Sequence, residues 1–354
     1  MLLQRRFQQG SSFAAKGVQN MDKNMNLGKR CIGALWLPVL MYLAMMIFCF
    51  ANGKMYFGSI AMWRTLVGDT AIAATCAWGI GIQWQCGRFD FSGGAIMLLS
   101  AIIAGNVAKY YTGSNMVVFA AICIGLCMIL SVGTALLYAY GRLPVSVSTI
   151  TIALIYEAIT PLVFNGSGVN LLANMKLKQF SQFPVVIIPF TAAFLAYWIF
   201  RTLTLTGKQS ELLANNQQAA VNIGINEKKN VILSYAFSGF VFGCATMIYA
   251  STSIKSASFT SLSTVGALFT NILPVFIGLA LAKYCGDSLG TLIGALTIAL
   301  MNYGLKAVLS AEKGSALSMI FMGVFILVFN IITTPYGSRI TEWYQEFRRK
   351  REIR

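Results

Sequence analysis

Long apolar segments alternate with short polar ones along most of this chain. The first, residues 31–51, contains no charged side chain, and about 20 residues of helix suffice to cross roughly 30 Å of hydrocarbon. Similar runs follow to near the C-terminus. They predict ten membrane helices at about 31–51, 59–83, from the end of the 87–94 stretch to 111, 116–140, 145–164, 183–203, 231–252, 263–282, 289–309 and 315–334. Asn271 and Pro274 interrupt the 263–282 run, and a broken helix is an alternative there.

Composition places the chain in the same class. Hydrophobic residues make up 57% of it and charged residues 11%, whereas a soluble domain carries roughly 25% charged residues. The sequence therefore predicts an all-α polytopic membrane protein.

The distribution of positive charge predicts the orientation of the helices. The formal charge of +16 is concentrated at the termini and between apolar runs, as the positive-inside rule requires, and this pattern does not indicate nucleic-acid binding. With ten helices and a cytoplasmic N-terminus, 19 Lys and Arg residues fall on the inner side and 7 on the outer side. We expect a basic cytoplasmic segment at 1–30, a transmembrane domain at 31–334 and a basic cytoplasmic tail at 335–354. The basic segment is longer than that of a cleaved signal peptide.

Few residues are suited to chemistry. The chain has no histidine, which excludes His-based catalysis and His metal sites. Its eight cysteines include no C-x-x-C pair, and most lie inside apolar runs, where cysteine behaves as a small hydrophobe. We expect no catalytic residue, no cofactor and no metal.

The longest polar interruption within the apolar part is residues 207–230. Its pattern predicts a short helix over 211–222 that ends at Gly224, because glycine adopts the left-handed C′ conformation at little cost. Asn226 is placed to cap the next helix, with Glu227 in its first turn. The alternative is an ordinary solvated loop.

The run 215–225, NNQQAAVNIGI, resembles the "G-x-N-x-x-A-A-x-x-x-G-I" loop of sugar-type ABC importer permeases, although the first glycine of that pattern is replaced here. In that family the loop is the coupling helix that docks on the ATPase subunit. The resemblance implies that the two alanines are small because the ATPase groove leaves no room, and that the docking residues are Asn216, Ala219, Ala220, Ile223, Gly224 and Ile225.

Further segments resemble the same family in the same order. Asp90, Ser92 and Gly94 match its "G-I-D-L-S-x-G" signature, and 142–149 matches its "R-L-P-x-F-I-x-T". Residues 235–240 resemble the helix that follows the coupling loop, and 289–296 match "L-G-T-L-I-G-A-L". The glycine-rich segment before that last motif is reduced here to 278–286.

The resemblance implies the permease subunit of an importer similar to the ribose, galactose and xylose systems, in the bacterial inner membrane. It implies three partners in addition to the lipid bilayer: a cytoplasmic ATPase, an extracytoplasmic solute-binding protein and a second permease copy or paralogue. No G-x-x-x-x-G-K-[ST] loop occurs, so ATP hydrolysis belongs to a separate subunit. The solute is expected to be a monosaccharide. Alternatives are a nucleoside or other small solute, a secondary transporter without an ATPase, or an intramembrane enzyme.

Polar residues inside apolar runs are candidates for the translocation path, because ionisable groups are costly in a membrane. Amides also join membrane helices by hydrogen bonding, and Asp90 is equally suited to capping a helix. The candidates are Asp69, Asp90, Asn106, Glu157, Asn271 and Asn302.

Overall fold

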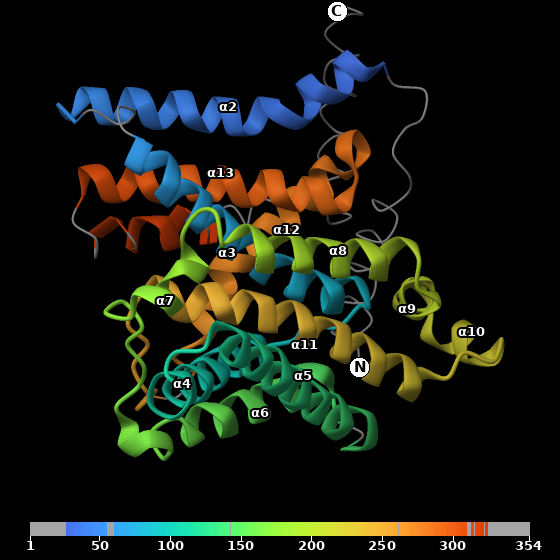
Figure 1. The fold of residues 1–354 in the computed structure, drawn as a ribbon. Helices are drawn as coiled ribbons and strands as arrows, with labels where there is room; N and C mark the ends of the chain where they lie inside the picture. The colour runs from blue at the N-terminus through green and yellow to red at the C-terminus, as the bar shows by residue number, and fades with distance from the viewer. Residues whose placement is uncertain are drawn as a thin grey trace, which may run out of the picture.

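The computed structural model describes residues 26–54, 60–141, 143–260, 262–309, 313–314, 316–321 and 323–324. Within these ranges the chain is helical, and the only strand-like pairing is an isolated antiparallel bridge between Val169 and Lys255. Figure 1 shows the long helices side by side in one bundle. The described residues confirm an all-helical membrane architecture.

The helices in chain order are α2 (Leu27–Ala51), α3 (Ile60–Gln85), α4 (Gly93–Tyr111), α5 (Met116–Gly141), α6 (Val145–Ile159), η1 (Val163–Gly166), α7 (Met175–Lys178), η2 (Gln179–Ser181), α8 (Ile187–Thr202), α9 (Leu205–Asn215), α10 (Gln217–Asn222), α11 (Glu227–Thr252), α12 (Val265–Cys285) and α13 (Asp287–Val308).

Six helices in the described part of the chain are long and apolar enough to cross a membrane, namely α2, α3, α4, α5, α11 and α13. The pair α8 and α9 passes the same test together but is bent by 63°. Helix α6 and the Leu268–Ala282 part of α12 are apolar and shorter. Every predicted run up to 289–309 therefore contains a helix, and ten spans remain a prediction because the run 315–334 lies mostly outside the described residues.

Helix α11 occupies the centre of the bundle and packs against α3, α4, α5 and α8. Gly239 and Gly243, one turn apart, allow it to approach α5 closely. A Cβ atom at Gly243 would lie 2.6 Å from the Cα of Ile124, and one at Gly239 would lie 2.8 Å from the Cα of Met128. Small residues with this spacing are typical of tightly packed membrane helices.

Helices α12 and α13 also pack closely at glycine residues. A Cβ atom at Gly290 would lie 2.6 Å from the carbonyl oxygen of Gly278, so the two backbones are in direct contact. A Cβ at Gly294 would lie 2.8 Å from the carbonyl oxygen of Pro274. The alternative of a broken helix at 263–282 is wrong, because α12 continues through Pro274 with α13 packed on it.

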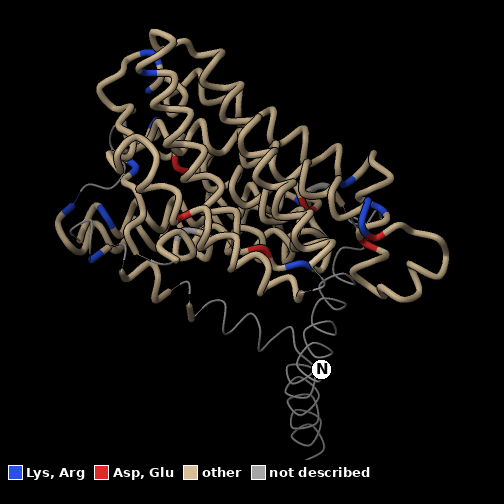
Figure 2. Tube along the Cα trace, turned by 90° about the horizontal axis from the view of Figure 1, so that it is seen from below, with Lys and Arg blue, Asp and Glu red and all other residues tan. Residues whose placement is uncertain are grey.

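The two ends of the bundle differ. Helices α9 and α10 lie at one end, called the inner end below, and α7 lies at the opposite, outer end (Figure 1). Figure 2 shows Lys and Arg gathered toward the two ends, with few charged residues between them. The positive-inside rule assigns the inner end to the cytoplasm, and this orientation remains a prediction. The basic segment before residue 26 and the tail 335–354 lie outside the described residues.

Candidate functional site

The polar stretch 207–230 forms two short helices. Helix α9 begins after Thr204, whose side chain accepts a hydrogen bond from the backbone N–H of Gly207 at 3.0 Å. It ends at Asn215, and α10 begins after Asn216, whose Oδ1 accepts the N–H of Ala219 at 3.1 Å. The single helix predicted over 211–222 is therefore wrong. Asn216 adopts an extended conformation and caps α10, because its short side chain competes with the helical backbone.

The end of α10 forms the turn that the sequence predicts. Gly224 has φ of +93°, its N–H donates to the carbonyl of Val221 at 2.9 Å, and the N–H of Ile225 donates to the carbonyl of Ala220 at 3.1 Å. These two bonds are those of a Schellman motif. Asn226 then caps α11 by accepting the N–H of Lys229 at 3.1 Å. The predicted roles of Gly224 and Asn226 in ending one helix and starting the next are confirmed.

The predicted docking residues divide into two groups by exposure. Ala220 and Ile225 are buried and form a small cluster with Leu213. Within this chain they hold α10 against α9, which already explains why residue 220 is small. The other predicted docking residues are exposed, namely Asn216, Ala219, Gly224 and Ile223, the last with 71% of its surface accessible.

A buried side chain ties this segment to the membrane helices. Oδ1 of Asn230, in the first turn of α11, accepts hydrogen bonds from Ser210 Oγ of α9 at 3.0 Å and from Arg88 Nη2 at 3.3 Å. Its Nδ2 donates to the carbonyl of Thr206 at 2.9 Å. Asn230 therefore joins α9, α11 and the loop between α3 and α4.

Sequence reasoning did not identify Asn230 or Arg88 as site residues. In the sequence, Arg88 is only one of the basic residues on the predicted cytoplasmic side, and Asn230 is only the last polar residue before an apolar run. The neighbouring Gly87 is a further sign of this contact, because at φ of +71° it lies against the Cα of Ala214 in α9, and an added Cβ would be 3.3 Å from that atom.

Asp90 lies in the same loop and caps the entry to α4. Its Oδ1 accepts the backbone N–H of Ser92 at 2.8 Å and the hydroxyl of Ser92 at 2.7 Å. Burial raises the pKa of the Asp90 carboxyl, and the hydrogen bonds from Ser92 oppose that shift. Its Oδ2 has no hydrogen-bond partner.

A second acidic side chain lies at the inner end, at the start of α13. Oδ2 of Asp287 lies 3.3 Å from Nε of Arg201 and accepts the hydroxyl of Tyr197 at 2.7 Å. Gln85, at the end of α3, donates to the same oxygen. Acids thus mark the entry of both α4 and α13, and each is placed near an arginine.

The other path candidates are spread over the molecule. Glu157 is buried at the end of α6 and accepts the backbone N–H groups of Ser263 at 3.2 Å and Thr264 at 2.8 Å. Asn106 is buried and donates to the carbonyls of Ile102 at 2.9 Å and Gly168 at 2.8 Å. Both side chains therefore bind backbone groups of the protein.

The remaining candidates are half-buried, with Asp69 on α3, Asn271 on α12 and Asn302 on α13. The charge of Asp69 interacts with that of Lys306 on α13. Asp90 lies three residues before α4, and Asn106 lies about 20 Å along that helix at 1.5 Å per residue. The six path candidates therefore do not gather in one site.

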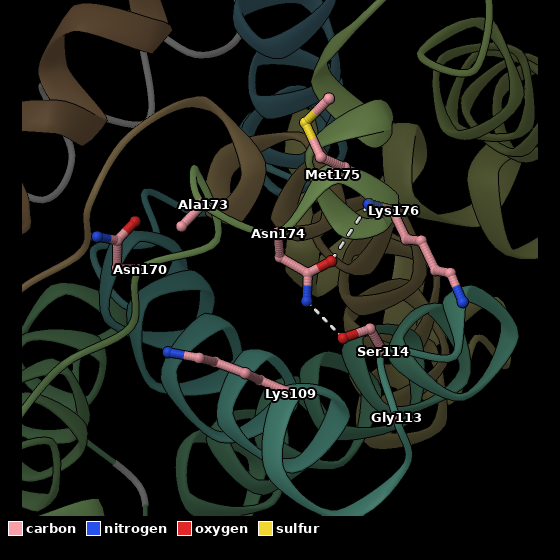
Figure 3. Close-up of a pocket in the computed structure, with 8 residues that line it drawn as sticks. All are labelled: Lys109, Gly113, Ser114, Asn170, Ala173, Asn174, Met175 and Lys176. Atoms are coloured by element: carbon pink, nitrogen blue, oxygen red, sulfur yellow. Dashed lines mark hydrogen bonds between the residues drawn. The ribbon is translucent and has the colours of Figure 1, made fainter.

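A depression of about 340 Å³ opens at the outer end. Figure 3 shows Lys109 reaching from α4 toward the loop that carries Asn170. Asn174 donates to the hydroxyl of Ser114, which holds its loop against the connection between α4 and α5, and accepts the N–H of Lys176 at 3.2 Å. Within the described residues, no group of three or more His, Cys, Asp or Glu side chains is placed to hold a metal ion.

Comparison with known proteins adds to this geometry. Residues 62–329 match the family described as the permease component of the branched-chain amino acid transport system. The ribose import permease RbsC of Escherichia coli K12 is 26% identical over 312 residues, covering 85% of this chain and 95% of its own.

Two other relatives act on different solutes. The fructose import permease FruF of Bifidobacterium longum is 23% identical over 300 residues, covering 82% of this chain and 81% of its own. An autoinducer 2 import permease, LsrD of Photorhabdus luminescens, is 24% identical over 357 residues, covering 92% of this chain and 99% of its own. No solved structure matches this chain.

Proposed function

Because this chain belongs to the family of branched-chain amino acid transport system permease components, we propose that it is the membrane-spanning subunit of a bacterial ABC importer for a monosaccharide. The family match confirms the resemblance predicted from the sequence and makes the chain a transport subunit. The monosaccharide is supported by the ribose and fructose import permeases among its relatives. The importer would act in the bacterial inner membrane.

The observation that carries the proposal is the construction of the inner end. Helix α9 leaves the bundle at a 63° bend from α8. The hydrogen bonds of Asn230 with Ser210 and Thr206 fix α9 to α11, and the cluster of Leu213, Ala220 and Ile225 holds α10 against α9. Ile223 and Val221 remain exposed outside the membrane helices, at 71% and 45%. An exposed apolar surface on a rigid support is suited to receive a partner protein and to transmit its movement.

The proposal gives the chain three partners. An ATPase subunit would bind α10 through Asn216, Ala219, Ile223 and Gly224. A solute-binding protein would meet the outer end, and a second permease copy or paralogue would complete the path.

Purification in mild detergent tests this assignment. The wild-type protein should retain an ATPase subunit, whereas Ile223→Asp should lose it, because a charge would be desolvated in the contact. Met175→Asp is the matched control, since Met175 is an exposed apolar residue (79%) at the outer end; this variant should retain the ATPase.

Two outcomes would contradict the proposal. If the wild-type protein retains no ATPase, the result favours a self-contained carrier. If Ile223→Asp binds the ATPase as the wild type does and supports the same rate of ATP hydrolysis, α10 is an ordinary surface loop.

A further inference from the structure

Of the buried polar atoms at the inner end without a hydrogen-bond partner, three belong to neighbouring side chains, whereas Oε1 of Gln85 and Oδ1 of Asp287 lie beside the Arg201 ion pair. The three atoms are Nη1 of Arg88, Oδ2 of Asp90 and the hydroxyl of Tyr235. Arg88 and Asp90 each retain 6% of their accessible surface, and Tyr235 retains none. Burying polar and charged groups without full compensation is unfavourable, so their presence together requires an explanation.

The two charged groups are neighbours that do not form an ion pair. No nitrogen of Arg88 lies within 4.0 Å of an oxygen of Asp90, although their charges interact electrostatically. Arg88 instead binds the neutral Oδ1 of Asn230 and lies 6.0 Å from the centre of the Tyr235 ring. A guanidinium gains more from a carboxylate than from an amide oxygen.

The neighbours of Arg88 lie on two elements, because Asn230 and Tyr235 belong to α11 and Asp90 belongs to the loop that leads into α4. Asn230 is hydrogen-bonded to Thr206 and Ser210 of α9, so its side chain follows movements of residues 205–222, called the coupling segment below. Asp90 is bonded to Ser92 and so belongs to the entry of α4. Tyr235 lies on α11, as Asn230 does, with the centre of its ring 6.0 Å from the guanidinium carbon of Arg88.

We propose that Arg88 is a two-position latch, held by Asn230 in the arrangement seen here and paired with Asp90 when the coupling segment moves. Movement of α9 turns the Asn230 side chain through its bonds with Ser210 and Thr206 and so withdraws its oxygen from Arg88. The guanidinium then turns to the open Oδ2 of Asp90, two residues along the same loop. The Tyr235 hydroxyl then donates to the same carboxylate. The exchange passes the displacement of α9 to the start of α4. It rests on the proposed function, because an ATPase supplies the movement.

A double-mutant cycle tests the latch in the complex of permease and ATPase. Arg88→Gln, Asp90→Asn and the double variant are compared by their affinity for a non-hydrolysable ATP analogue. Asp90→Asn retains the Oδ1 acceptor for Ser92, so the entry of α4 is preserved. Because nucleotide affinity is the measured quantity, the cycle gives the coupling energy between Arg88 and Asp90 in the nucleotide-bound state relative to the nucleotide-free state.

Each single variant should weaken analogue affinity by about tenfold, a typical coupling between sites. The affinity of the double variant for the analogue should be no lower than that of the single variant that binds it less tightly. The control pair, Arg201→Gln and Asp287→Asn, should give additive effects, because that ion pair is already formed at 3.3 Å. If Arg88→Gln fails to insert, Arg88→Lys takes its place in the cycle, because the ammonium retains the charge but loses the planar fork of donors.

The outcomes separate the two proposals. If the wild-type permease retains an ATPase but Arg88 and Asp90 behave additively, the latch alone is wrong. Equal non-additivity in the control pair would overturn the latch in the same way. If the wild-type permease retains no ATPase, the proposed function fails and the latch fails with it.

Discussion

The carboxylate of Glu157 accepts the backbone N–H of Thr264 at 2.8 Å, although the two residues belong to different membrane segments. Thr264 immediately precedes α12, and the neighbouring N–H of Ser263 binds the other carboxylate oxygen at 3.2 Å. A negative charge at a helix N-terminus binds unsatisfied N–H groups and is favoured by the helix dipole. Glu157 therefore serves as the cap of α12, supplied by α6.

Replacing Glu157 by Gln should destabilise the protein. The amide retains one acceptor, but its NH₂ group would face an N–H donor and the favourable charge would be lost. The expected loss is about 1–2 kcal/mol, as for removal of a helix cap, measured as a lower midpoint of thermal unfolding in detergent.

The same variant separates capping from a role in the translocation path. We expect the inserted Glu157→Gln protein to support ATP hydrolysis by the complex at the wild-type rate. Unchanged stability combined with loss of that activity would instead place the carboxylate in the path.

The local features of the inner end could be predicted because each is encoded by one or two adjacent residues. Gly224 ends a helix through its own freedom at positive φ, and Asn226 caps the next helix with its own side chain. The break at Asn216 was missed because the apolar and amide pattern continues across it, whereas the competing hydrogen bond from the N–H of Ala219 to Oδ1 of Asn216 depends on backbone geometry.

The contacts between helices could not be predicted in this way. Arg88 and Asn230 are 142 positions apart, and Glu157 and Thr264 are 107 positions apart. Their partners are determined by how whole helices pack. Apolar periodicity locates a membrane helix but does not assign its neighbours when most faces are hydrophobic.

The close approach of α11 to α5 predicts a sharp difference between two glycines. Gly243→Ala should destabilise the bundle by about 1–3 kcal/mol, as overpacking does, because the new methyl group would lie 2.6 Å from the Cα of Ile124. Gly125→Ala is the control, because Gly125 lies on the facing helix with no atom within 4 Å of its added Cβ. Thermal unfolding of both variants in the same detergent measures the difference, and equal midpoints would contradict the packing described here.

The orientation of the bundle leads to a third prediction. Cysteines introduced at Gln217 and at Lys176 in a cysteine-depleted protein should be labelled from opposite sides of the membrane. A reagent that does not cross the membrane should label position 176 in intact cells and position 217 only in inverted vesicles. Both positions are exposed, so accessibility does not limit either reaction. Labelling of position 217 from outside would overturn the assignment of α10 to the cytoplasm.

The last prediction concerns Gly224, where conformation can be separated from packing. Its φ is +93°, and nothing lies within 4 Å of an added Cβ atom. Within this chain a substitution there acts through the backbone alone. The left-handed region costs an ordinary residue roughly 1–2 kcal/mol and a β-branched residue more, whereas asparagine tolerates it.

We therefore expect the stability of the Schellman motif to decrease from the wild type through Gly224→Asn and Gly224→Ala to Gly224→Val. Hydrogen exchange at the N–H of Ile225, which donates to the carbonyl of Ala220, should accelerate in that order. Thermal unfolding of the bundle should stay constant, because the turn lies outside the membrane helices. ATP hydrolysis by the complex should fall in the same order if α10 must present Ile223 in one fixed direction. Gly224→Val protein that exchanges faster but retains full ATP hydrolysis would show that the turn shapes the loop without coupling it to the ATPase.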